Sequence, residues 1–205
     1  MRTAKPKNAG VKLRAVLLFG APGSGKGTQG KILGTIPNYY HFSCGDIFRN
    51  LTPDTPLGKT FLNYSSRGQL VPDEPTIELW RHNIEMAERG GRFSPATDTL
   101  VLDGIPRNPH QAQMLESTVK VRFVFYLSCP DVGELVERLQ RRALRESRLD
   151  DANMEVIRER LEIYERETRP VLEYYGPELV RTIDSTQTPI NVLRDILRIL
   201  AHAPP

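Results

Sequence analysis

The sequence predicts an α/β fold in which a parallel β-sheet is flanked by helices, and three observations support this. Short apolar runs bounded by turn residues recur along the chain, as expected for strands buried on both faces. Segments with helical periodicity lie between these runs, and strands alternating with helices are typical of layered α/β domains. A glycine-rich segment directly follows the first run. With 205 residues, 39% of them hydrophobic, the chain is long enough to bury a sizeable core.

The elements can be placed along the chain from these patterns. Strands are predicted at residues 15–19, 100–102 and 121–127, and a weaker one at 180–183. One helix is predicted over residues 155–175, because apolar and small side chains recur there at spacings of three and four. Its stripe consists of Ile157, Leu161, Tyr164, Thr168, Val171 and Tyr175. A second helix is predicted over residues 190–200, with a stripe of Ile190, Leu193, Ile196, Leu197 and Leu200.

Two polar, turn-rich regions interrupt the alternation of strands and helices. They cover residues 51–73 and 140–153, and we expect them to be inserts or mobile flaps on one core domain. Residues 1–12 are basic and lack the apolar stretch of a signal peptide, so we expect a disordered tail there. Residues 201–205 are expected to be a frayed end.

Charge and cysteine content restrict the functional class. The formal net charge is only +3, which is too small for a protein whose main role is to coat nucleic acid. No apolar segment is long enough to suggest a membrane span. Cys44 and Cys129 are the only cysteines, so neither a disulfide framework nor a four-cysteine zinc site can form within one chain. A reducing, cytoplasmic setting is the natural expectation.

The glycine-rich segment has the spacing of a phosphate-binding loop. Residues 20–28 read GAPGSGKGT, between a predicted strand and a predicted helix start. Glycines allow successive backbone N–H groups to turn toward one anion, and the helix N-terminus adds partial positive charge. Lys26 lies where it can reach the β- and γ-phosphates of a nucleotide. The general phosphate-loop pattern has Ser or Thr directly after the lysine, but this chain has Gly27 there and Thr28 one residue later. We therefore expect Thr28 to contact a metal through water.

The string GAPGSGKGTQ resembles the phosphate loop of the adenylate kinases, and three further blocks extend the resemblance over residues 16–200. The resemblance implies a P-loop three-layer fold with an acceptor-nucleotide flap at residues 43–73 and a short lid at 138–151, both within a kinase domain of residues 13–205. It also implies ATP and AMP as substrates, Mg²⁺ as cofactor, and a monomer that binds neither nucleic acid nor membranes. The ATP-binding residues would be Gly23, Ser24, Gly25, Lys26, Gly27, Thr28, Arg138 and Gln187.

Two blocks are similar to the acceptor site of that family. They are FSCGDIFR at residues 42–49 and LVLDGIPR at residues 100–107, the latter followed by Gln111. The resemblance implies that Arg49 and Arg107 bind the acceptor phosphate and that Gln111 reads the base. The full implied AMP-binding set is Cys44, Arg49, Gln69, Val71, Gly104, Arg107 and Gln111. Asp103 ends a predicted strand, where ligands bind in open α/β sheets, and it is the candidate Mg²⁺ residue.

The fourth block is rich in arginine and resembles the short-lid form of the family. The resemblance implies that Arg142, Arg148 and Arg160 act in catalysis together with Lys26, and that Asp150 and Asp151 orient the arginines. Arg141 and Arg145 are expected to be ordinary surface residues.

Three alternatives to an adenylate kinase remain. A pyrimidine monophosphate kinase would normally carry Asn where this chain has Gln111. A non-catalytic nucleotide-binding module would not need Lys26 and every lid arginine. A nucleic-acid-binding protein would need aromatic or groove-reading elements, which the sequence lacks.

Overall fold

The structure is a computed structural model that describes residues 12–146 and 148–202. Of the predicted basic tail, only Lys12 is among these residues, and residues 1–11 lie outside them. Of the predicted frayed end, residues 203–205 likewise lie outside the described part.

The five described strands form one parallel sheet, which confirms the predicted fold class. Their spatial order is β2-β3-β1-β4-β5, and every neighbouring pair is parallel. The order reverses direction at β1, and such a switch point places a crevice at the carboxyl ends of the strands. The strands are β1 (Leu13–Phe19), β2 (Tyr39–Ser43), β3 (Thr99–Asp103), β4 (Val119–Ser128) and β5 (Val180–Asp184).

Strand β2 is missing from the sequence prediction. It is an edge strand that pairs only with β3 among the described strands, with Tyr39 opposite Thr99 and Ser43 opposite Asp103. Its residues are half-buried except for Phe42, so the segment lacks the continuous apolar run by which the buried strands are recognised. The aromatic residues Tyr39, Tyr40 and Phe42 were the available signal, because aromatic side chains favour strands.

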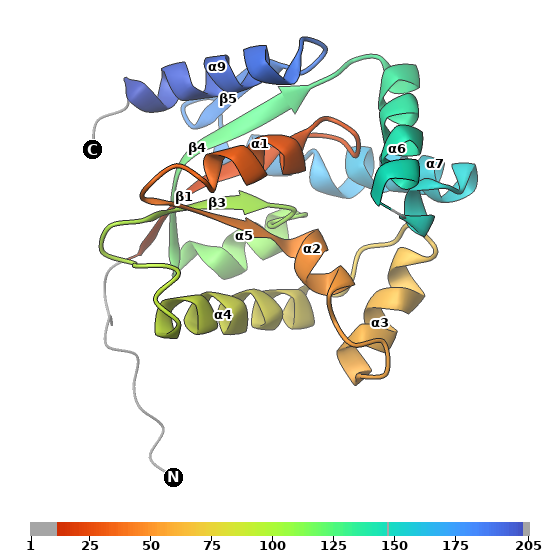
Figure 1. The fold of residues 1–205 in the computed structure, drawn as a ribbon, viewed down its shortest axis with the longest axis horizontal. Coiled ribbons are helices and arrows are strands. Elements are labelled where there is room, and N and C mark those ends of the chain that lie inside the picture. Colours follow the sequence, from red (N-terminus) through yellow and green to blue (C-terminus); the bar gives the residue numbers. More distant parts are fainter. Residues whose placement is uncertain (1–11, 147, 203–205) are drawn as a thin grey trace.

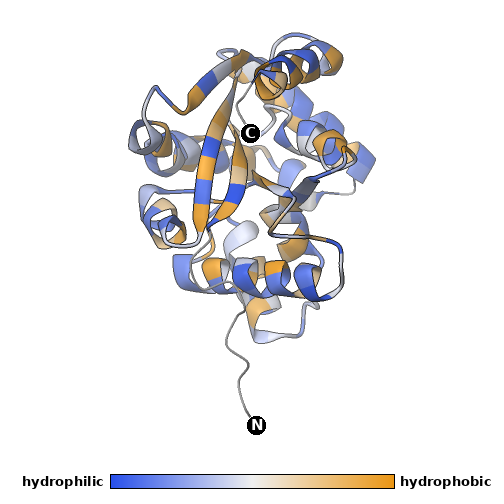
Figure 2. Cartoon of the chain, turned by 90° about the vertical axis from the view of Figure 1, so that its left-hand side faces the viewer, coloured by the Kyte–Doolittle hydropathy of each residue, from blue (hydrophilic) through white to orange (hydrophobic). Residues whose placement is uncertain are grey.

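Helices cover both faces of the sheet, with α1 and α9 above it and α4 and α5 below it in Figure 1. Alternate side chains of β1 therefore enter two separate cores: Ala15 and Leu17 face one, and Val16 and Leu18 face the other. The outer helices mix hydrophobic and hydrophilic positions along their length (Figure 2), as expected for helices with one buried face. These helices are α1 (Lys26–Leu33), α4 (Asp73–Arg89), α5 (Pro109–Glu116) and α9 (Pro189–Ala201).

The helix predicted over residues 155–175 is not continuous, and this part of the prediction is wrong. The structure has α7 (Met154–Ile163), a π-helical turn (Tyr164–Thr168) and α8 (Val171–Tyr175). The Arg169 N–H donates to the Tyr164 carbonyl five residues earlier, at 2.8 Å. Pro170 follows, and proline disrupts a helix because it lacks an N–H and clashes with the preceding turn. Ile157, Tyr164 and Val171 of the predicted stripe are nevertheless buried.

Both interrupting regions contain helical segments. The first contains all of α3 (Pro56–Ser65), which follows α2 (Cys44–Arg49), and Phe48 and Phe61 stack between these helices with ring centroids 5.3 Å apart. The second contains the end of α6 (Val132–Glu146) and a 3₁₀ turn (Leu149–Asp151) before α7. Both regions project from the carboxyl end of the sheet, on which the site is built (Figure 1).

Candidate active site

A cleft of about 590 Å³ lies at the carboxyl ends of the strands. Its volume is in the range of small-molecule binding sites. Every site residue predicted from the sequence lines this cleft except Gln111. The lining set is Gly23, Ser24, Gly25, Lys26, Gly27, Thr28, Cys44, Arg49, Gln69, Val71, Asp103, Gly104, Arg107, Arg138, Arg142, Arg148, Arg160 and Gln187.

The phosphate loop depends on two glycines. Gly25 is the N-cap of α1 with φ of 95°, and Gly23 has φ of 87°, a region that other residues rarely adopt. A Cβ on Gly23 would lie 2.7 Å from the Leu135 carbonyl oxygen, so the loop is packed tightly against α6. The loop therefore presents the N-terminus of α1 to the cleft, an arrangement that suits an anion.

Lys26 is the first residue of α1, and its ammonium group folds back onto the loop. Nζ donates to the carbonyl oxygens of Gly20 at 2.7 Å and Ala21 at 3.0 Å. Burial, together with the charges of Arg142, Arg107 and Arg160, lowers the pKa of Lys26 from 10.5 to about 8, against the opposing charge of Asp103. The lysine is thus a cation at neutral pH that lacks a full counter-charge.

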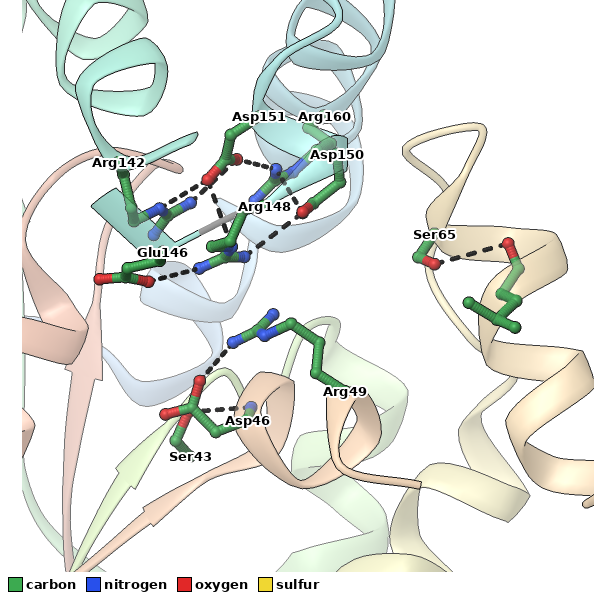
Figure 3. A network of polar contacts seen from close by, with 11 residues as sticks. Ser43, Asp46, Arg49, Ser65, Arg142, Glu146, Arg148, Asp150, Asp151 and Arg160 are labelled. Atoms are coloured by element: carbon green, nitrogen blue, oxygen red, sulfur yellow. Dashed lines mark hydrogen bonds and ion pairs between the residues drawn. The ribbon is translucent and has the colours of Figure 1, made fainter. Parts of the chain in front are cut away.

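Two arginines of the lid (residues 138–151) and Arg160 of α7 share two aspartates (Figure 3). Arg142 binds Asp151 in a bidentate manner, with Nε–Oδ2 and Nη2–Oδ1 distances of 2.6 and 3.0 Å. Arg148 lies 3.3 Å from both Asp150 and Asp151, and Arg160 contacts both carboxylates. Asp151 comes from the 3₁₀ turn, Arg142 from α6 and Arg160 from α7, so the carboxylates hold three elements together.

Asp151 is ionised even though it is buried. Burial raises the pKa of its carboxyl, but the hydrogen bond from Arg142 and the charges of Arg160, Arg142 and Arg148 outweigh this and leave the pKa below its usual range. The cluster can therefore keep its arginines aimed at the cleft in the absence of any ligand.

Two lid-region arginines expected to be ordinary surface residues also line the cleft. Arg141 and Arg145 are exposed, but both reach the lining surface. Their spacing on α6 was the available signal, since Arg138, Arg141 and Arg145 recur at intervals of three and four and therefore share a helix face.

The predicted acceptor residues form the wall opposite the lid cluster. Arg49 extends from α2 and is paired with Asp46 (Figure 3). Arg107 Nε donates to the Gly104 carbonyl at 2.9 Å. Cys44 is buried beside them, and burial raises the pKa of its thiol to about 11, so the thiol is protonated at neutral pH. Cys44 thus contributes a small neutral side chain to this wall.

Gln111 lies behind this wall and does not line the cleft. It is buried in α5, where its Oε1 accepts from the Arg107 N–H at 2.8 Å and its Nε2 donates to Asp73 Oδ1 at 2.7 Å. Gln111 is therefore held against a cleft residue, with one hydrogen bond on each amide atom.

The predicted donor residues sit at the far end of the cleft. Arg138 donates to the Ser185 carbonyl oxygen at 2.8 Å, and Gln187 Nε2 donates to Asp195 Oδ2 at 2.7 Å. The first contact joins α6 to the loop between β5 and α9, and the second joins that loop to α9. Both side chains line the cleft.

Asp103 ends β3 next to the phosphate loop. A Cβ on Gly27 would lie 3.5 Å from its Oδ2, and His41 Nε2 lies 4.0 Å away. Among the described residues, no group of three or more His, Cys, Asp or Glu side chains is arranged to hold a metal. A single carboxylate and the Thr28 hydroxyl fit Mg²⁺, which keeps several waters and is shared with substrate phosphates.

Comparison with known proteins places these features in a family. The family model described as adenylate kinase matches residues 18–179. The chain is 38% identical over 192 residues to an adenylate kinase of Cyanothece sp., which covers 90% of this chain and 94% of the relative. It is 37% identical over 186 residues to that of Thermus thermophilus, covering 87% and 92%, and 33% identical over 219 residues to that of Streptomyces coelicolor, covering 90% and 97%. A family match over most of the chain, together with relatives above 30% identity, shows that this chain belongs to the adenylate kinase family.

Proposed function

We propose that the chain catalyses the reversible transfer of a phosphoryl group from ATP to AMP, giving two molecules of ADP. Its family supports this reaction. The proposal depends mainly on one observation: the phosphate loop, the lid arginines and the acceptor wall with Arg49 and Arg107 all line the same cleft. Such a cleft can hold two nucleotides with their phosphates facing each other between Lys26 and the arginines.

The main obstacle to this reaction is electrostatic. Two phosphate charges 4 Å apart repel by about 4 kcal/mol at an effective dielectric constant near 20. In the proposed mechanism, Arg49 and Arg107 bind the acceptor phosphate, while Lys26, Arg142, Arg148 and Arg160 stabilise negative charge on the transferring group. For this to happen, the phosphates must compete with Asp150 and Asp151 for the arginines.

Mg²⁺ is the proposed cofactor, and Asp103 would hold it through water, with Thr28 nearby. When bound, the metal supplies positive charge that neutralises phosphate oxygens. Asp103 is suited to this because it is close to the loop and is buried. Thr28 is exposed at the start of α1, so its hydroxyl is free to face solvent or a hydrated ion.

The proposed mechanism needs no general base, because the acceptor phosphate oxygen is already ionised at neutral pH. Positioning is then the main task of the protein. Water is the competing acceptor, and closure of the flap (residues 43–73) and the lid (residues 138–151) would exclude it.

We infer a cytoplasmic monomer that uses ATP and AMP as its substrates and binds no nucleic acid or membrane. The balanced charge and the two free cysteines support this setting. Among the described helices, none is both long and apolar enough to cross a membrane.

The test is ADP formation from ATP and Mg²⁺ with each of the four common ribonucleoside monophosphates. AMP should be the best acceptor, with CMP and UMP poorer by at least about tenfold in kcat/KM, a difference of roughly 1.4 kcal/mol. Gln111→Asn should narrow this gap, and Cys44→Thr should keep or widen it. Equal turnover of UMP or CMP and AMP would favour a pyrimidine kinase, and absence of transfer with every acceptor would favour a binding module.

A further inference from the structure

Helix α3 of the flap (residues 43–73) ends at a glycine in the left-handed region. Gly68 has φ of 73° and is buried. Its N–H donates to the Ser65 carbonyl at 3.1 Å, and the Gln69 N–H donates to the Tyr64 carbonyl at 3.0 Å. This pair of hydrogen bonds is the Schellman motif, a frequent end of helices that favours glycine. The helix end therefore explains the backbone conformation of Gly68, but not its burial.

The burial of Gly68 comes from its close approach to α7. A Cβ on Gly68 would lie 3.0 Å from the Val156 carbonyl oxygen, 3.1 Å from Arg160 Cγ and 3.3 Å from Glu159 Cβ. All three distances are shorter than ordinary van der Waals contact. The Val156 carbonyl and Glu159 Cβ are fixed to the helix backbone, so a side chain on Gly68 would displace α7 by a few tenths of an ångström.

Gly91 shows that the same helix end does not require such a contact. It follows α4 with φ of 68°. Its N–H donates to the Glu88 carbonyl at 3.0 Å, and the Arg92 N–H donates to the Ala87 carbonyl at 2.9 Å, so the motif is the same. Gly91 is exposed, and a Cβ built on it would have no atom of the described residues beyond its chain neighbours within 4 Å. The close approach to α7 is thus a feature of the flap and not of the motif.

The contact at Gly68 connects the flap to one of the clustered arginines. Arg160 lines the cleft, and its guanidinium contacts Asp150 and Asp151. The flap also carries Arg49, which belongs to the acceptor wall. At Gly68, the backbone on the acceptor side therefore touches the stem of a side chain that is proposed to act on the transferring phosphoryl group.

We propose that Gly68 is a positioning residue for phosphoryl transfer, because its bare backbone lets the flap pack against α7 and keeps Arg160 within reach of the transferring group. This inference rests on the proposed kinase function. Catalytic groups must be held within about 0.5 Å of their productive geometry, so a shift of a few tenths of an ångström uses up most of this tolerance. Transfer should slow, whereas ground-state binding, to which many other cleft residues contribute, should change little.

The experiment compares Gly68→Ala with Gly91→Ala. Both variants place Ala at a similar positive φ, but only the first places its Cβ against another helix. Steady-state kinetics with ATP, AMP and Mg²⁺ would be measured under conditions in which urea unfolding shows both variants to be folded. A misplacement of about 1 Å can cost about 10²-fold, so Gly68→Ala should lower kcat by about fivefold and leave both KM values within about twofold. Gly91→Ala should have the kcat of the wild type.

A double-mutant cycle shows whether the effect acts through Arg160. In an Arg160→Ala background there is no guanidinium to misplace, so Gly68→Ala should lower the remaining kcat by less than about twofold. Gly68→Asn and Gly91→Asn form a second pair, because Asn adopts the left-handed conformation at lower cost than Ala and serves where the Ala variant does not fold.

Three results would overturn the proposal. One is the same kcat in the Gly68 and Gly91 variants, and another is a full fivefold loss in the Arg160→Ala background, as expected from a merely structural role. The third is a rise in KM for AMP with kcat unchanged, because the contact would then only shape the flap. Failure of the wild type to make ADP from ATP and AMP would instead contradict the proposed function.

Discussion

Lys26 shows how one residue is prepared for its role by its surroundings. Burial and the neighbouring Arg142, Arg107 and Arg160 disfavour its charge. Among the described residues, its ammonium donates to two backbone carbonyls, and the charge of Asp103 favours the charged form. A polyphosphate would supply the missing negative charge. The low pKa shows that nearby groups compensate the buried ammonium only in part, so an anion bound there would stabilise its charged form.

A prediction for Lys26 concerns pH. Because its pKa in the unliganded protein is about 8, the affinity for ATP should fall above that pH by up to tenfold per pH unit, until the pKa of the complex is reached. ATP binding measured by calorimetry from pH 7 to 10 tests this. Lys26→Met should bind ATP weakly with little pH dependence in this range and should lose transfer activity, whereas Lys120→Met on the exposed start of β4 should behave like the wild type.

Loss of stability would not explain such a fall in affinity. The folded pKa of Lys26 lies below its ordinary value of 10.5, so the folded protein binds fewer protons than the unfolded chain between about pH 8 and 10.5. The contribution of this group to the free energy of unfolding therefore rises with pH in that window. A wild-type affinity that stays constant up to pH 10 would contradict the assigned contact with phosphate.

At the scale of elements, the lid region works as a unit. Helix α6, the 3₁₀ turn and α7 each contribute charged side chains, and Asp151 joins them from its buried position. Removing one arginine would leave part of an ionised, buried carboxylate unpaired, so its effect includes a rearrangement of the others. Single substitutions in this cluster should therefore not be additive.

Substitution of a lid arginine should affect turnover more than binding. Arg142→Ala and Arg148→Ala should each lower kcat by on the order of 10³, as for other arginines that stabilise a transferring phosphoryl group. Steady-state kinetics with ATP varied at saturating AMP separate kcat from KM. Arg166→Ala is the control, because Arg166 is exposed and its ion-pair partner is the half-buried Glu167. A rise in KM alone would mean that the lid arginines bind ground-state ATP instead.

At the scale of the whole molecule, the sheet separates two cores that share its strands. Trp80 lies in α4 and belongs to the core between this helix and the sheet, whereas Phe125 belongs to the core that α1 and α9 cover. Both side chains are buried. Since each strand contributes to both cores, loss of packing on one face should be transmitted to the other through the backbone hydrogen bonds of the sheet.

We therefore expect Phe125→Ala to destabilise the whole domain. The loss should be about 3–5 kcal/mol, as is usual when a buried aromatic side chain is truncated. Urea unfolding followed by fluorescence of Trp80, the single tryptophan, should shift together with the far-UV circular dichroism signal. Leu144→Ala is the control, because Leu144 is 88% exposed and its loss should change stability by less than about 0.5 kcal/mol. Separate transitions for the two signals would show that the two cores unfold independently.

The fold class, the phosphate loop and the position of Asp103 could be predicted from local sequence, whereas the acceptor and lid residues were implied by the resemblance to the adenylate kinases. Buried strands produce continuous apolar runs. The loop at residues 20–28 has the spacing of glycines and lysine that is typical of a phosphate-binding loop. The half-buried edge strand β2 has no such run, and the π-helical turn at Tyr164–Thr168 has the same apolar spacing as a regular helix. Neither element could therefore be recognised from the periodicity of apolar residues.

What the sequence determined by itself is the chemistry of the site: which residues carry charge, and in which block of the chain each lies. Tertiary structure decided which of them share a partner. Asp73 and Gln111 are 38 residues apart, and only the packing of α4 beside α5 brings their side chains to 2.7 Å. Likewise, Arg142 and Arg160 meet at Asp151 because a 3₁₀ turn folds α7 back toward α6. Sequence spacing predicts contacts within one helix or strand, whereas contacts between elements depend on how their buried faces pack.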